Sequence, residues 1–299
     1  QMGSPRKINL VELGPGRGTL MADALRAVRN VPGLSDALTV RFVETSPVLR
    51  THQQTAIMPY GIPATWHEAF DDIPVSGNAP MIVIGNEFFD ALPIRQFERA
   101  SHGWCERLVG VDANTGELGF VRGAETPVTD ALVPATLRGT AKPGDIFESC
   151  PAAIAIADQV ARRLNAVGGA ALFIDYGHPH SAFGDTLQAL KDHKYHPVLE
   201  QPGDADLTAH VDFAAIGRAM LEADARIGAV LTQGTFLRML GIEQRAELLK
   251  EGADDVQAKS IDAALARLID ADQMGTLFKV LIGYGRETAP PPCVSGAEG

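Results

Sequence analysis

The sequence has few cysteines, no long apolar segment and a shortage of basic charge. Its three cysteines lie far apart with no C-x-x-C pair, so the sequence suggests neither a disulfide framework nor a zinc ribbon, and a reducing compartment fits best. No apolar run approaches the ~20 residues that span a bilayer, and no signal segment opens the chain. Because 26 basic residues stand against 37 acidic ones, binding to nucleic acid through its phosphates is not expected either.

The two ends of the sequence carry little pattern. The chain does not begin with Met and enters its first strand almost at once, so we expect a native N-terminal segment to be missing. Residues 288–299 have no apolar period and include three successive prolines, which predicts a flexible tail. The 299 residues are enough for one elaborated domain with a full core.

What the sequence does have is a glycine-rich turn. An apolar strand at residues 8–13 runs into alternating glycines and then a helix, and glycine allows such a backbone to turn tightly against a ligand. The spacing is G-x-G-x-G, whereas the dinucleotide fingerprint is G-x-G-x-x-G. S-adenosylmethionine carries an ammonium and a sulfonium but no phosphate, so it suits a turn preceded by an acid better than a pyrophosphate does. The expected contacts to this cofactor are Glu12, Gly14, Pro15, Gly16 and Gly18.

Strand-like and helical patterns alternate along most of the chain, which predicts βαβ units and a mainly parallel sheet. Residues 94–150 instead alternate like an antiparallel hairpin, with a turn at residues 114–116, and we interpret them as an inserted substrate-side subdomain. Residues 1–93 and 151–287 are then the core, with helical additions at about 185–275. The strands are predicted at residues 8–13, 39–44, 62–66, 81–84, 171–175, 227–232 and 277–284.

Polar residues follow the second and third of these strands, where an open α/β sheet binds its ligands. Glu44 can accept hydrogen bonds from both hydroxyls of a ribose, the alternative being a solvated acid. Ser46 begins the next helix as its N-cap and is counted with the cofactor site. His67 is a candidate contact to adenine, as are its neighbours Trp66 and Glu68, and the alternative for this histidine is a structural or solvent-facing role.

The fourth strand ends at an amide and a carboxylate, Asn86 and Glu87, where donor and acceptor of a methyl group should meet. Glu87 can hold a cationic acceptor, and an arginine guanidinium matches a carboxylate with two parallel hydrogen bonds. Asn86 counts toward both the cofactor site and the catalytic site. Asp90 and Asp175 are candidates to accept the released proton. For Asp90, the alternative is a cap on a helix that begins at Ala91.

A metal site is not expected. Four histidines in the second half of the chain invite that interpretation, but no cysteine or carboxylate completes a ligand spacing. They are His178, His180, His193 and His196.

Taken together, several motifs resemble the MidA-like family of S-adenosylmethionine-dependent methyltransferases, which includes the mitochondrial arginine methyltransferase of respiratory complex I assembly. The resemblance covers nearly the whole chain. The motifs are LVELGPGRGTLM at residues 10–21, NEFFDALP at 86–93, IDYG at 174–177, GDTL at 184–187, DLTAHVDF at 206–213, TQGTFL at 232–237 and MGTLFKV at 274–280.

The resemblance implies an α/β class I methyltransferase fold, a Rossmann-like and mostly parallel seven-stranded sheet with its last strand antiparallel. It also implies S-adenosylmethionine as cofactor and arginine in a protein substrate as acceptor, with the large core subunit of complex I as a possible partner. A bacterial chain of this kind would be cytoplasmic, and a eukaryotic one would act in the mitochondrial matrix. The resemblance implies a segment before the first strand that helps to cover the cofactor, and this is the segment that we expect to be missing here.

Two other functions remain open from the residues alone. The acceptor could be a small molecule or another protein residue. The chain could also bind S-adenosylmethionine as a structural ligand and act as an assembly chaperone. The oligomeric state does not follow from the sequence.

Overall fold

The computed structural model describes residues 3–75, 77–125, 132–192 and 194–294. The chain divides into two compact units, the first made of Gln1–Phe88, Ala155–Tyr176 and Ile216–Gly299 and the second of Phe89–Ile154 and Gly177–Ala215. The insertion expected at residues 94–150 is therefore only part of the second unit. Residues 177–215, which the sequence placed within the core, also belong to the second unit.

The first unit contains a mixed, mostly parallel sheet in the order β14-β16-β9-β4-β1-β2-β3. The order reverses between β1 and β4, so a ligand is expected at the carboxyl ends of these strands. β16 runs antiparallel to β9, as expected for the last long strand. The bounds are β1 Ile8–Leu13, β2 Leu38–Val43, β3 Ala64–His67, β4 Met81–Asn86, β9 Gly169–His178, β14 Arg226–Ile227 and β16 Phe278–Tyr284.

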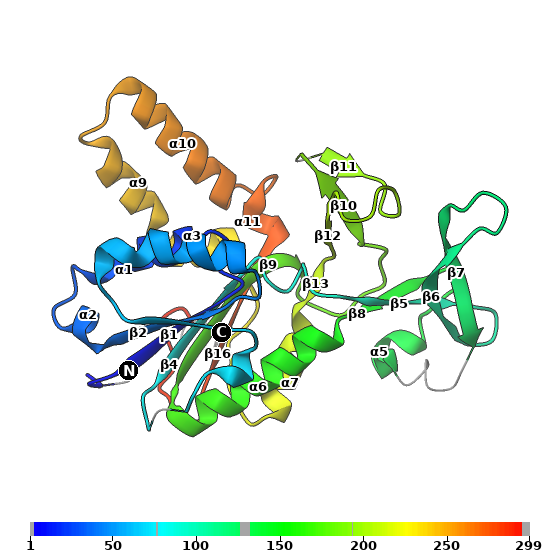
Figure 1. Cartoon of the computed structure of the whole chain (residues 1–299), viewed down its shortest axis with the longest axis horizontal. Helices are drawn as coiled ribbons and strands as arrows, with labels where there is room; N and C mark the ends of the chain where they lie inside the picture. The colour runs from blue at the N-terminus through cyan, green and yellow to red at the C-terminus, as the bar shows by residue number, and fades with distance from the viewer. Residues whose placement is uncertain (1–2, 76, 126–131, 193, 295–299) are drawn as a thin grey trace. The chain divides into compact units, whose positions relative to one another are not determined.

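Helices cover both faces of this sheet (Figure 1). α1 (Thr19–Val28) and α3 (Pro47–Ile57) lie on one face, and α6 (Pro151–Val167) and α7 (Phe213–Glu222) lie on the other. The remaining elements are α2 Leu34–Ala37, η1 Met58–Tyr60, η2 Phe70–Asp72, β15 Leu231–Thr232, α8 Gln233–Met239, α9 Ile242–Lys250, α10 Asp255–Ile269 and α11 Met274–Leu277.

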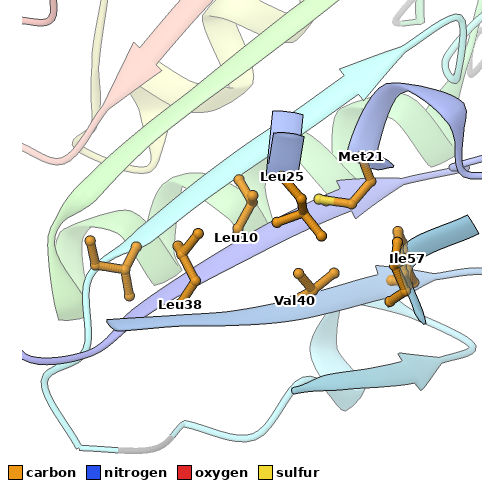
Figure 2. Close-up of a cluster of buried hydrophobic side chains, with 8 residues drawn as sticks. Leu10, Met21, Leu25, Leu38, Val40 and Ile57 are labelled. Carbon is orange, nitrogen blue, oxygen red and sulfur yellow. The ribbon is translucent and has the colours of Figure 1, made fainter. Parts of the chain in front are cut away.

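A buried apolar cluster joins β1 and β2 to α1 and α3 (Figure 2). Met21 and Leu25 are one turn apart on α1 and are both buried, as the helical spacing predicts. Each aliphatic side chain buried in this way contributes about 1.5–3 kcal/mol. The cluster therefore fixes the two helices that follow the glycine turn and Glu44. Its labelled members are Leu10, Met21, Leu25, Leu38, Val40 and Ile57.

The second unit is built on an antiparallel sheet in the order β7-β6-β5-β8. Phe97, Trp104, Val133 and Phe147 form its buried core. The predicted turn at residues 114–116 is present, with Gly116 at a φ of 73°. The bounds are β5 Arg95–Arg99, β6 Trp104–Val111, β7 Leu118–Glu125, α5 Ala135–Arg138, β8 Ile146–Ser149, β10 Gln188–Lys191, β11 Lys194–His196, β12 Asp206–Thr208 and β13 Val211–Asp212.

Three local expectations differ from the structure. The chain makes a single turn that contains Asp90, in which the Leu92 N–H donates to the Phe89 carbonyl, and no helix follows for Asp90 to cap. The strand expected at residues 227–232 is two short strands, β14 and β15.

The third difference concerns the expected flexible tail. Thr288 accepts a hydrogen bond from the Gly169 N–H at 3.1 Å, and Val294 packs against a buried cluster, so residues 288–294 are anchored to the core. Residues 295–299 of that tail lie outside the described residues. Within the described part of the chain, no helix is both long and apolar enough to cross a membrane.

Candidate functional site

The glycine turn follows β1 directly and owes its shape to left-handed backbone. Gly14, Gly16 and Gly18 have φ angles of 58°, 53° and 79°, which residues with a Cβ rarely adopt. A Cβ at Gly14 would lie 2.7 Å from the Phe88 ring, and one at Gly18 would lie 3.0 Å from the Gln53 Cα. A Cβ at Gly16 would meet no heavy atom within 4 Å. The turn is therefore packed on both sides and open at Gly16.

Glu12 is a buried acid at the end of β1, with 3 % of its surface exposed. Its Oε2 has no hydrogen-bond partner among the described residues. Burial raises the pKa of this carboxyl to about 8, since the charged form loses its hydration. A positively charged ligand group would supply the missing partner and favour the charged form.

Glu44 stands just beyond β2, and its carboxylate is oriented by the protein itself. Oε1 accepts the Ser46 N–H at 2.8 Å, and Oε2 accepts Nε2 of Gln53 at 3.1 Å. The Arg50 guanidinium donates from Nε to the Glu44 carbonyl at 2.8 Å. Ser46 is also the expected N-cap of α3, since its hydroxyl accepts the Leu49 N–H. Each carboxylate oxygen has a further lone pair, which leaves acceptors for a pair of ligand hydroxyls.

His67, at the end of β3, belongs to a polar row across three strands. Its Nε2 lies 2.8 Å from the Thr65 hydroxyl, which accepts a hydrogen bond from Arg41, and Arg41 also donates to Asn9. Burial, and then the charge of Arg41, hold the pKa of His67 below its ordinary value. Its Nε2 is thus engaged within the protein, and its contact with adenine stays a prediction.

Asn86 and Glu87 end β4, the strand next to β1. Glu87 is exposed and has a φ of 49°, an uncommon conformation that costs about 1 kcal/mol or more for a residue with a Cβ. The Glu87 N–H donates to the Ile174 carbonyl at 3.0 Å, which ties this conformation to β9. The Asn86 side chain approaches the Glu87 carboxylate at 3.4 Å.

Asp175 is fully buried on β9, where it accepts hydrogen bonds from two backbone groups. Its Oδ2 accepts the Phe88 N–H at 3.1 Å, and its Oδ1 accepts the Tyr176 N–H at 3.0 Å. The carboxylate therefore connects the segment that carries Glu87 to β9. Its role as proton acceptor stays a prediction.

Asp90 is buried and belongs to the second unit, where its carbonyl accepts the Ala209 N–H at 3.0 Å. Among the described residues, no group of three or more potential metal ligands occurs, so His178, His180 and His196 are not gathered at a metal site. His193 lies outside the described residues. His178 and His196 contact the backbone carbonyls of His180 and Glu200 instead.

The sequence did not indicate a role in the site for Gln53 or Arg50. Both lie on α3 and hold Glu44. A signal for Gln53 was present: Leu49, Gln53 and Ile57 are four residues apart, so a glutamine interrupts the apolar face of a helix.

S-adenosylmethionine fits these residues. Its ammonium would meet Glu12, a buried acid whose Oε2 has no hydrogen-bond partner among the described residues. Its ribose would meet the oriented carboxylate of Glu44. The turn leaves space at Gly16 for the cofactor to approach the backbone. When bound, it supplies a methyl group made electrophilic by a sulfonium. Together with the strand order and the antiparallel β16, the site defines a class I methyltransferase.

Comparisons with known proteins identify the family. The model of a family of S-adenosyl-L-methionine-dependent methyltransferases matches residues 1–229, and the chain belongs to this family. It is 38% identical to the protein arginine methyltransferase NDUFAF7, mitochondrial, of Xenopus laevis over 301 residues, which are 93% of this chain and 67% of that protein. The corresponding protein of Danio rerio is 33% identical, over 93% of this chain and 69% of its own length.

Two solved structures are also similar to this chain over most of its length. A protein of Burkholderia thailandensis bound to S-adenosyl-homocysteine is similar with a TM-score of 0.79 and 29% identity, over 94% of this chain and 72% of that one. A second crystal structure from the same organism gives a TM-score of 0.82 and 30% identity, over 96% and 76% of the two chains. The chain is therefore an enzyme that uses S-adenosylmethionine, as the sequence predicted.

Proposed function

We propose that this enzyme transfers a methyl group to an arginine side chain of a protein substrate, and that Glu87 binds the guanidinium. The observation that carries the proposal is the exposed Glu87 carboxylate, held in a left-handed conformation at the end of β4. A guanidinium is protonated at all accessible pH values, and its planar fork matches a carboxylate with two parallel hydrogen bonds. The similarity to relatives named as protein arginine methyltransferases supports this acceptor.

The other site residues would have distinct roles. Glu12, Gly14, Pro15, Gly16, Gly18, Glu44, Ser46, His67 and Asn86 would hold the cofactor. Asn86 would also steer the Glu87 carboxylate, from which its Nδ2 lies 3.4 Å. Asp175 would keep the Phe88 backbone, and hence Glu87, in place. Transfer of a methyl group to a guanidinium nitrogen releases one proton, and Asp90 and Asp175 are our candidates to accept it.

The substrate would be a subunit of respiratory complex I, of which the large core subunit is the first to test. This partner and the part in complex I assembly come from the family resemblance. The relatives' names place those proteins in mitochondria. A eukaryotic chain would act in the matrix and a bacterial one in the cytoplasm.

The test is Glu87→Gln, which keeps the size of the side chain and removes its charge. Transfer of tritiated methyl groups to arginine-containing peptides should fall roughly a hundredfold, because a buried or substrate-bound charge pair loses one partner. Affinity for S-adenosyl-homocysteine, measured by calorimetry, should stay within about twofold, since Glu87 is assigned to the acceptor. The matched control is Glu222→Gln, an exposed acid at the end of α7, which should leave both quantities unchanged.

Three results would count against the proposal. Equal losses of cofactor affinity and activity in Glu87→Gln would move Glu87 to the cofactor site. Label found on lysine or on a small molecule, and none on arginine, would exclude the proposed acceptor. Rescue of complex I assembly by inactive Glu87→Gln in a knockout strain would instead favour a chaperone.

A further inference from the structure

Gln53 is a polar side chain that is completely buried, with 0 % of its surface exposed. It lies on α3, which begins just after Glu44 and packs against α1 in the cluster of Figure 2. A buried amide is costly unless its hydrogen bonds are made. The hydrogen bonds of the Gln53 amide therefore indicate what this side chain holds in place.

The amide of Gln53 contacts three separate segments. Its Nε2 donates to the Gly16 carbonyl at 2.8 Å and to Oε2 of Glu44 at 3.1 Å. Its Oε1 accepts a hydrogen bond from Nε1 of Trp66 at 2.8 Å. One side chain thus joins the glycine turn, the acid after β2, and β3.

The chemistry of the partners allows only one orientation of this amide. The indole N–H of Trp66 can only donate, so it requires the amide oxygen. The Gly16 carbonyl and the Glu44 carboxylate can only accept, so they require the amide nitrogen. Reversing the amide would place like groups opposite each other on both sides.

The Gln53 backbone is also pressed against the turn. A Cβ at Gly18 would lie 3.0 Å from the Gln53 Cα, so glycine is needed there for α3 to come so close. Ser46 holds the other oxygen of the Glu44 carboxylate. The carboxylate and the turn are consequently fixed relative to each other in the free protein.

From these contacts we infer that Gln53 is a positioning residue for S-adenosylmethionine, which locks the glycine turn to Glu44 before the cofactor arrives; the inference rests on the ribose contact proposed above for Glu44. Preorganisation of this kind raises affinity because the order need not be created on binding. The inference concerns the cofactor alone. It stands or falls independently of the proposed arginine acceptor.

The first test is the affinity of Gln53→Met for S-adenosyl-homocysteine, measured by calorimetry without any acceptor. Methionine keeps the length of the side chain and removes its hydrogen bonds. We expect a loss of about tenfold to a hundredfold, since Glu44, Gly16 and Trp66 each lose a partner. The KM for S-adenosylmethionine should rise in parallel, while the KM for the acceptor should stay within about twofold. A mere loss of folded protein would not produce this difference between the two KM values.

The chain offers a matched control in Gln54, the adjacent and exposed glutamine of the same helix. Gln54→Met should bind S-adenosyl-homocysteine like the wild type. A folded Gln53→Met protein with wild-type affinity would overturn the inference.

A second variant decides the matter if Gln53→Met does not fold. Trp66→Phe keeps an aromatic ring beside Phe42, whose centroid lies 5.5 Å from that of Trp66, and removes the N–H donor that orients the Gln53 amide together with part of the indole ring. Affinity for S-adenosyl-homocysteine should fall about threefold to tenfold. An unchanged affinity in this variant would refute the positioning role.

Discussion

The backbone N–H of Phe88 donates to Oδ2 of Asp175 at 3.1 Å, one residue beyond the strained Glu87. A buried carboxylate on β9 therefore fixes the end of β4. Because Oδ1 of the same group accepts the Tyr176 N–H, both oxygens are used to position the backbone.

Asp175→Asn should destabilise the protein by about 1–3 kcal/mol, because either orientation of the new amide sets its NH₂ group against one of the two backbone donors. Urea unfolding measures the change. The control is Asp158→Asn on α6, whose carboxylate forms an exposed pair with Arg162 and should be worth less than about 0.5 kcal/mol. Equal losses in the two variants would mean that Asp175 does not hold this segment.

A second prediction concerns Glu12 and pH. The pKa of this carboxyl is about 8 in the folded protein, against an ordinary value of 4.5. Between these values the folded state keeps a proton that the unfolded state has lost, so stability falls as pH rises through this range. Below pH 4.5 Glu12 is protonated in both states and does not lower the stability of the folded protein. Above pH 8 it is charged in both states, and its contribution to stability no longer changes with pH.

Glu12→Gln removes this titration while keeping the shape of the side chain. In the absence of cofactor, the melting temperature of the variant relative to wild type should rise steadily from pH 5 to pH 8, by an amount equivalent to at most about 1.4 kcal/mol per pH unit. Thermal unfolding at four pH values measures it. A difference that is flat across this range would show that Glu12 is already charged in the free protein.

Strong local patterns made much of this fold predictable. The glycine turn, the Ser46 cap with its following proline, and the apolar spacing of Met21 and Leu25 each depend on residues close in sequence. Gln53 and Asp175 were harder, since their roles depend on partners in distant segments of the chain: Trp66 and Gly16 for the first, Phe88 for the second. Burial of a polar group is visible in sequence, but its partners are not.

The short elements were missed for a related reason. β10, β11 and β12 have only three or four residues each, too few to show an alternating pattern, and they are held by pairing with one another. This small sheet lies within residues 177–215 of the second unit, where the sequence suggested helical additions to the core.

The third prediction compares two glycines with left-handed backbone. Gly18→Ala would place a Cβ 3.0 Å from the Gln53 Cα, whereas Gly33→Ala would meet nothing within 4 Å. Both variants should lose about 1–2 kcal/mol from backbone strain, and only Gly18→Ala should lose more from displacement of α3. Urea unfolding of the pair separates the two causes, and equal losses would show that α3 moves at no cost.

The last prediction tests whether the conformation of Glu87 is maintained at the expense of stability. Glycine adopts a positive φ freely, so Glu87→Gly should stabilise the fold by up to about 1 kcal/mol while abolishing methyl transfer. Asp224, an exposed residue after α7 with a φ of 62°, provides the control: Asp224→Gly should give a similar gain with full activity. Melting temperature and methyl transfer are measured on both variants. If Glu87→Gly is less stable than wild type, the carboxylate contributes more to the fold than its strained backbone costs, and Glu87 acquires a structural role beside the proposed contact with the acceptor.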